Sequence, residues 1–208
     1  MPLRERDVTV AAAMGVEAWA VRRRAPGVWV QRVGIGARAW SGGFATPTVL
    51  SIGLAGGLRS GLTPGTVVVA TSVASEQGAT VHCDAAWVAG LTAAARRLGL
   101  DAVQAPVLTA LHLVTRAERG RWARQGFAAV DMESAQLAGR GASLAVVRVI
   151  LDTPERELSP KWEQGWRAVL DPRLAAEAVW LLPHSRRFAL RAAAVLAEAL
   201  RGDVDAEV

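Results

Sequence analysis

The chain has 208 residues, of which 51% are hydrophobic and 21% are charged, and this composition is typical of a globular protein rather than a disordered one. No apolar run approaches the roughly 20 residues that a membrane-spanning helix needs. The net charge is +5 and the pI is about 11.0, but the arginines occur in short, separate runs without an aromatic platform among them. We therefore expect one domain over residues 1–208 with a basic surface, rather than a nucleic-acid-binding protein.

The amino-terminal segment and the single cysteine bear on the cellular compartment and on possible disulfides or metal sites. The first ten residues, MPLRERDVTV, contain no apolar signal core, so we expect a cytoplasmic protein. Cys83 is the only cysteine of the sequence, which excludes an internal disulfide and leaves no cysteine cluster for a metal. We expect neither a metal nor a cofactor.

Short apolar runs alternate along the chain with segments of helical spacing. Strands are predicted at residues 8–13, 28–33 and 49–52, in the segment PGTVVVATSVAS, and at residues 103–108, 127–130 and 143–152. Helices are predicted at residues 14–24 and 85–98, and two more between residues 171 and 201, separated at Pro183. Continuous apolar strands between helices indicate an α/β fold with a largely parallel or mixed sheet.

Polar or glycine-rich segments follow four of the predicted strands: MGVE, GLAGG, VDMES and ILD. Ligands of such sheets bind beyond the carboxyl ends of the strands, so these segments together predict a binding site. Each also has a structural interpretation. Glu17 could favour the helix dipole, residues 53–57 could form a tight turn, Asp131 and Glu133 could cap a helix, and Asp152 could be a turn residue.

Three carboxylates at one edge of a sheet suit the cleavage of an N-glycosidic bond. A carboxylate beside the sugar stabilises the positive charge that develops there. A carboxylic acid can give the departing base a proton, and a third carboxylate can activate water.

The order GLAGGL, PGTVVVAT, VDMES and VVRVILD resembles the purine and uridine phosphorylase and nucleosidase superfamily, and the resemblance extends from about residue 8 to about residue 152. It implies a three-layer α/β/α fold with a mixed, partly barrelled central sheet. It also implies that Glu133 holds the ribose 2′- and 3′-hydroxyls, that Met132 packs beneath the sugar, and that Asp152 protonates or hydrogen-bonds the purine.

The same resemblance assigns roles to two further segments. Leu54, Ala55 and Gly56 correspond to a loop beside the ribose and the nucleophile. The segment AMGVEA is similar to the start of methylthioadenosine/S-adenosylhomocysteine nucleosidases, which places Glu17 at the position of their water-activating glutamate.

The resemblance favours hydrolysis over phosphorolysis. No arginine precedes GLAGG, where a phosphorylase of the trimeric type has one, and the charge of Glu17 would repel phosphate. The alternative is a phosphate-dependent purine nucleoside phosphorylase. The family implies a homo-oligomer that acts on a small-molecule nucleoside, with water or phosphate as the nucleophile.

Departures from the family pattern bear on the substrate. Leu54 stands where the nucleosidases have a hydroxyl residue, and Leu151 rather than a serine precedes Asp152. These residues predict a more apolar pocket than that of the methylthioadenosine enzymes. Futalosine hydrolases and hopanoid-associated phosphorylase-like proteins resemble the chain in VDMES and in the GLAGG segment, and VRVILDTPERELSP is most similar to the second group.

The hopanoid-associated resemblance implies a 5′-modified adenosine, with adenosylhopane as the candidate, release of adenine and peripheral contact with a membrane lipid substrate. Trp162, Trp166 and Trp180 could contact such an apolar ligand, or could belong to the core or to a subunit interface. Leu54 and the shortened segment before Pro47 leave a third alternative, a family member that binds a nucleoside without cleaving it.

Overall fold

A computed structural model describes residues 5–37, 40–78, 80–139, 142–159, 161–162 and 171–202. The strands are β1 Val8–Ala12, β2 Trp29–Arg32, β3 Thr48–Gly57, β4 Val67–Ser75, β5 Thr80–His82, β6 Ala102–Thr109, β7 Ala129–Asp131 and β8 Ser143–Asp152. The helices are α1 Gly15–Arg24, α2 Ala85–Arg97, α3 Arg116–Arg124, α4 Ser134–Leu137 and α5 Ala175–Gly202. Short 3₁₀ helices lie at Glu5–Asp7, Ile35–Ala37 and Pro172–Leu174.

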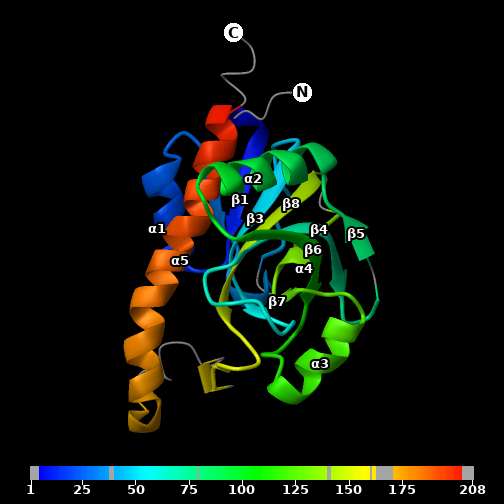
Figure 1. The fold of residues 1–208 in the computed structure, drawn as a ribbon. Coiled ribbons are helices and arrows are strands. Elements are labelled where there is room, and N and C mark those ends of the chain that lie inside the picture. The colour runs from blue at the N-terminus through cyan, green and yellow to red at the C-terminus, as the bar shows by residue number, and fades with distance from the viewer. Residues whose placement is uncertain are drawn as a thin grey trace.

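All the strands above belong to one eight-stranded sheet, and five of them close into a ring (Figure 1). In this ring β3 pairs with β8, β8 with β4, β4 with β6, β6 with β7, and β7 with β3. The pairs β8–β4 and β7–β3 are antiparallel, and the other three are parallel. β1 and β2 extend the sheet from β3, and β5 extends it from β4. The predicted α/β class with a mixed, partly barrelled sheet is confirmed.

Alternate residues of the central strands face two different hydrophobic clusters. Leu50 and Val147 belong to a cluster that includes residues of α1, α2 and α5, whereas Val49 and Val146 belong to a cluster on the other face with Leu137 of α4. Figure 1 shows α1 and α5 side by side against the sheet, where they also contact one another. Burial of both faces explains why β3 and β8 are almost continuously apolar in the sequence.

The carboxyl-terminal segment differs from its prediction. Residues 175–202 form the single helix α5, with Pro183 inside it, rather than two helices separated at Pro183. A proline removes one backbone hydrogen bond, to the carbonyl four residues earlier. That residue, Val179, is 76% exposed, so water can bond its carbonyl. Farther along, α5 is held by the buried side chains of Phe188 and Leu196 in the core, and this packing outweighs the local cost of the proline.

The glycine-rich segment also differs from its prediction. Residues 53–57 are the last part of β3, not a loop after it, because Gly56 pairs with Val130 and Gly57 pairs with Ala129 of β7. The register against β8 shifts between Ala55 and Gly56. The segment is therefore a bulged strand end within the ring.

None of the helices in the described part of the chain has both the length and the apolar character needed to cross a bilayer.

Candidate active site

Glu17 lies in the first turn of α1, directly after the carboxyl end of β1, and its side chain is buried. Its Oε2 accepts a hydrogen bond from the backbone N–H of Met14 at 2.8 Å, and its Oε1 accepts one from the backbone N–H of Leu54 at 3.1 Å. Burial raises the pKa of Glu17, although these two bonds oppose the shift. The carboxyl group thus links the start of α1 to the end of β3 and is a stronger base than an exposed glutamate.

Glu133 lies between β7 and α4 and is also buried. Its Oε1 accepts a hydrogen bond from the backbone N–H of Gly36 at 2.9 Å, and its Oε2 has a longer contact, 3.4 Å, with the backbone N–H of Met132. Burial raises the pKa of Glu133 to about 7, and the charges of Asp131 and Glu17 act in the same direction. Glu17 and Glu133 are thus both buried acids held by backbone N–H groups, Glu17 at the end of β3 and Glu133 by the segment that follows β2.

A buried polar network fixes the segment that carries Glu133. Asp131 Oδ1 accepts bonds from the backbone N–H groups of Glu133 and Ser134, both at 3.3 Å. Asp131 Oδ2 accepts a bond from Arg148 Nε at 2.9 Å, and Arg148 Nη2 donates to Ser51 Oγ at 2.6 Å. Asp131 therefore has the predicted structural role at the junction of strand and helix, and the network joins β3, β7 and β8.

Asp152, at the carboxyl end of β8, is paired with a buried arginine. Arg119 Nη2 of α3 forms an ion pair with Asp152 Oδ2, and Arg119 Nη1 donates to the carbonyl of Gly57 at 2.9 Å. The backbone N–H of Leu158 donates to the same carboxylate oxygen at 3.3 Å. Burial raises the pKa of Asp152, and the charge of Arg119 opposes this shift.

The bulged end of β3 lies against both Glu17 and Asp152. A Cβ atom at Gly53 would collide with the carboxyl group of Glu17, and one at Gly56 would lie 3.0 Å from Asp152 Oδ1. The end of β3 therefore has Glu17 next to Gly53 and Leu54, and Asp152 next to Gly56. The glycines here serve close approach rather than a turn.

The other predicted contact residues occupy different surroundings. Leu54 packs its side chain in the core beside α1 and α5 and gives its backbone N–H to Glu17, while Ala55 is buried in the cluster on the opposite face. Met132 is half-buried beside Glu133. The contacts of these residues with a substrate stay predictions.

Three groups at the site were not predicted from the sequence: the side chains of Arg119 and Arg148 and the backbone N–H of Gly36. Arg148 interrupts the apolar run VVRVIL, and a charged residue within a buried strand needs a buried partner. The sequence could therefore have predicted that Arg148 is buried with a partner. In contrast, nothing in the segment ERGRWAR indicates that the side chain of Arg119 points inward to Asp152.

The late tryptophans have contacts within the chain. Trp162 Nε1 donates to Glu177 Oε2 at 2.7 Å, and the ring of Trp180 stacks on His184 with centroids 4.4 Å apart. Both contacts lie on the amino-terminal half of α5. Trp166 lies outside the described residues.

Comparisons with known proteins agree with this architecture. The family model described as Phosphorylase superfamily matches residues 42–170, which include β3, β8 and all the site residues except Gly36 and Glu17. No curated protein matches the sequence of the chain.

Solved structures of nucleosidases have a similar fold. The 5′-methylthioadenosine/S-adenosylhomocysteine nucleosidase of Neisseria meningitidis, in complex with methylthio-immucillin-A, matches with a TM-score of 0.71 at 20% identity, over 95% of this chain and 99% of its own. The futalosine hydrolase of Helicobacter pylori matches with a TM-score of 0.70 at 15% identity, over 94% and 97%. A structure described as a candidate 5′-methylthioadenosine/S-adenosylhomocysteine nucleosidase of Borrelia burgdorferi bound to adenine matches with a TM-score of 0.71 at 14% identity, over 93% and 99%.

Proposed function

Because the chain belongs to the phosphorylase superfamily, whose members cleave the glycosidic bond of nucleosides, we propose that it hydrolyses a purine nucleoside with water as the nucleophile. The products are the free purine base and the free sugar. The base is adenine, in line with the adenine-bound Borrelia structure and the methylthioadenosine nucleosidases of the same fold.

The observation that carries this proposal is the environment of Glu17. Its carboxyl group is buried and accepts the backbone N–H groups of Met14 at 2.8 Å and Leu54 at 3.1 Å. A carboxylate held in this way can take a proton from water at the sugar, because its raised pKa makes it a stronger base than an ordinary glutamate.

The reaction balances with one water molecule. Glu17 accepts a proton from water while the water oxygen forms a bond to the anomeric carbon of the ribose. The carbon–nitrogen bond breaks and its electron pair leaves with the purine, which takes a proton from the carboxyl group of Asp152. Asp152 is ion-paired with Arg119 at rest. Burial raises the pKa of Asp152, so it can take up a proton and pass it to the purine, while Arg119 and Leu158 fix its position.

Glu133 holds the ribose in this proposal. One of its oxygens accepts the N–H of Gly36 at 2.9 Å, and the other has only the long contact of 3.4 Å. A carboxylate has about four acceptor sites, so Glu133 retains the capacity to bind the 2′- and 3′-hydroxyls. Met132, its neighbour in the chain, packs beneath the sugar.

Water is favoured over phosphate as the nucleophile because the buried arginines are already paired with carboxylates. Arg119 is paired with Asp152, and Arg148 with Asp131. A phosphate ion would have to compete with these carboxylates and would also approach the charge of Glu17. A neutral water molecule meets neither obstacle.

The 5′ substituent of the substrate is apolar in this proposal. Ile35 is 52% exposed and directly precedes Gly36, whose backbone N–H donates to Glu133. An exposed apolar residue therefore adjoins the segment that contacts the sugar-binding acid. The resemblance to hopanoid-associated proteins makes adenosylhopane the specific candidate, with contact to a membrane lipid substrate as a consequence. The protein acts as a homo-oligomer in the cytoplasm.

The test is a product assay with adenosine, methylthioadenosine and a long-chain 5′-alkyl adenosine. The proposal predicts free adenine from the long-chain compound and little from methylthioadenosine. Efficient turnover of methylthioadenosine without turnover of the long-chain compound would reject the apolar substituent. Binding of adenine without turnover of any nucleoside would indicate a non-catalytic family member.

A further inference from the structure

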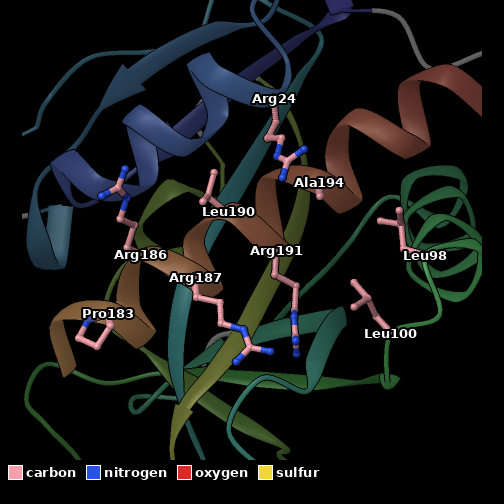
Figure 2. Close-up of a pocket in the computed structure, with 9 residues that line it drawn as sticks. All are labelled: Arg24, Leu98, Leu100, Pro183, Arg186, Arg187, Leu190, Arg191 and Ala194. Carbon is pink, nitrogen blue, oxygen red and sulfur yellow. The ribbon is translucent and has the colours of Figure 1, made fainter. Parts of the chain in front are cut away.

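An open groove lies outside the candidate active site, on the outer surface of α5. It has a volume of about 610 Å³ and is lined by nine residues from α1, from the segment that ends α2, and from α5 (Figure 2). They are Arg24, Leu98, Leu100, Pro183, Arg186, Arg187, Leu190, Arg191 and Ala194. Arginine runs that are far apart in the sequence thus meet in the fold, around an apolar floor.

The groove residues of α5 form one stripe along the helix. Positions 183, 186, 187, 190, 191 and 194 are three or four residues apart, and such residues share a face of a helix. The stripe continues toward the start of α5 with Val179 and Leu182, which are 76% and 59% exposed. This surface of α5 therefore combines exposed aliphatic side chains with arginines.

The positive charge of the groove has no acidic counterpart among its lining residues. Arg191 donates a hydrogen bond to the carbonyl of Gly65, which is uncharged, and Arg186 lies over the ring of Trp19 at 4.6 Å. Burial and the neighbouring charge of Arg187 lower the pKa of Arg191, as expected for two cations that repel one another. Figure 2 shows Arg187 and Arg191 extending from α5 in the same direction.

We propose that this groove and the exposed stripe of α5 bind the surface of an anionic phospholipid bilayer. The four arginines contact the phosphate groups, and the exposed side chains of Leu98, Leu182 and Val179 enter the boundary between headgroups and acyl chains. Helices that lie on membranes combine these two features, basic residues and an aliphatic surface. A nucleic acid would match the charge but would gain little from the exposed leucine and valine side chains.

Co-sedimentation with vesicles tests this surface, using phosphatidylcholine alone and phosphatidylcholine mixed with phosphatidylglycerol. We expect binding only to the mixed vesicles, and weaker binding at high salt. A basic residue near an anionic surface contributes about 1 kcal/mol, so Arg187→Gln should lower the partition coefficient about fivefold, and Arg186→Gln with Arg187→Gln about 25-fold. The matched control is Arg121→Gln with Arg124→Gln on α3, which removes the same charge and should leave the binding unchanged.

Several results would overturn the proposal. They are equal binding to both kinds of vesicle, an equal loss in the α3 control, preference for a DNA duplex over the vesicles, and self-association through this face detected by sedimentation. Leu182→Ser provides a second variant with no change of charge, and it should weaken vesicle binding without altering the unfolding transition. Vesicle binding needs no turnover, so this test and the test of nucleoside hydrolysis can fail independently.

Discussion

Glu17 in the first turn of α1 accepts the backbone N–H of Leu54 at the end of β3, with the two atoms 3.1 Å apart. This bond joins two segments that lie 37 positions apart in the sequence and places a buried carboxyl group at the end of β3. Glu17 and Glu133 both have raised pKa values for the same reason, which is their burial.

Replacement of Glu17 by glutamine should remove the proposed base and keep its shape. Loss of a general base typically lowers the rate by a factor of about 10² to 10⁴, so we expect kcat for adenine release to fall in that range. Glu5→Gln is the matched control, because Glu5 is exposed at the other end of β1. Unchanged activity in Glu17→Gln would show that another group activates the nucleophile.

The pH profile gives a second check on Glu17. A base must be ionised to act, and burial raises the pKa of this one. The acidic limb of kcat should therefore have its midpoint above the ordinary glutamate range, and the limb should disappear in Glu17→Gln. A midpoint within the ordinary range would contradict the burial of Glu17.

Gly53→Ala should displace Glu17, because the added Cβ would collide with its carboxyl group. Overpacking of this kind costs about 1–3 kcal/mol of unfolding free energy, and we expect activity to fall as well. Gly15→Ala is the control, since a Cβ there meets nothing within 4 Å. Chemical denaturation of both variants measures the difference, and equal stability would place Glu17 farther from β3.

Arg119→Met should leave Asp152 as an unpaired buried charge. Removing one partner of a buried ion pair costs about 3–5 kcal/mol, whereas Arg121→Met on the exposed face of the same helix should change stability by less than about 0.5 kcal/mol. Combining Arg119→Met with Asp152→Asn should recover much of the loss. Additive losses in urea unfolding would mean that the two side chains do not interact.

The stability of the folded chain should fall as the pH rises toward neutrality. Glu133 has a pKa raised to about 7, so the folded state retains a proton that the unfolded state has already lost. Its contribution is complete below the ordinary glutamate pKa and is lost as the pH rises through about 7, a total of about 3 kcal/mol. In Glu133→Gln this part of the decrease should be absent. A wild-type stability that increases over the same range would contradict the assignment.

Much of the sheet was predictable because burial leaves a direct trace in the sequence. The run SLAVVRVILD predicts residues 143–152 as a strand, and β8 has these bounds. Two predictions from local propensity were wrong. The break at Pro183 does not occur because core packing holds α5 together, and residues 53–57 are not a loop because they pair with β7.

The site was predictable only in part. Acids at strand ends can be read along the chain, and Glu17, Glu133 and Asp152 are all buried in the fold. The pairing of Asp152 with Arg119 depends on how α3 packs, and the groove on α5 depends on how the ends of α1 and α2 meet that helix. Both are tertiary relationships that no local pattern contains.

The most direct measurement is the release of adenine from a 5′-alkyl adenosine, followed by chromatography with and without inorganic phosphate, for the wild type and for Glu17→Gln. Hydrolysis predicts the same rate of adenine release in both conditions, free sugar as the second product, and loss of the activity in the variant. A requirement for phosphate with formation of a sugar 1-phosphate, or an equal rate in Glu17→Gln, would contradict it.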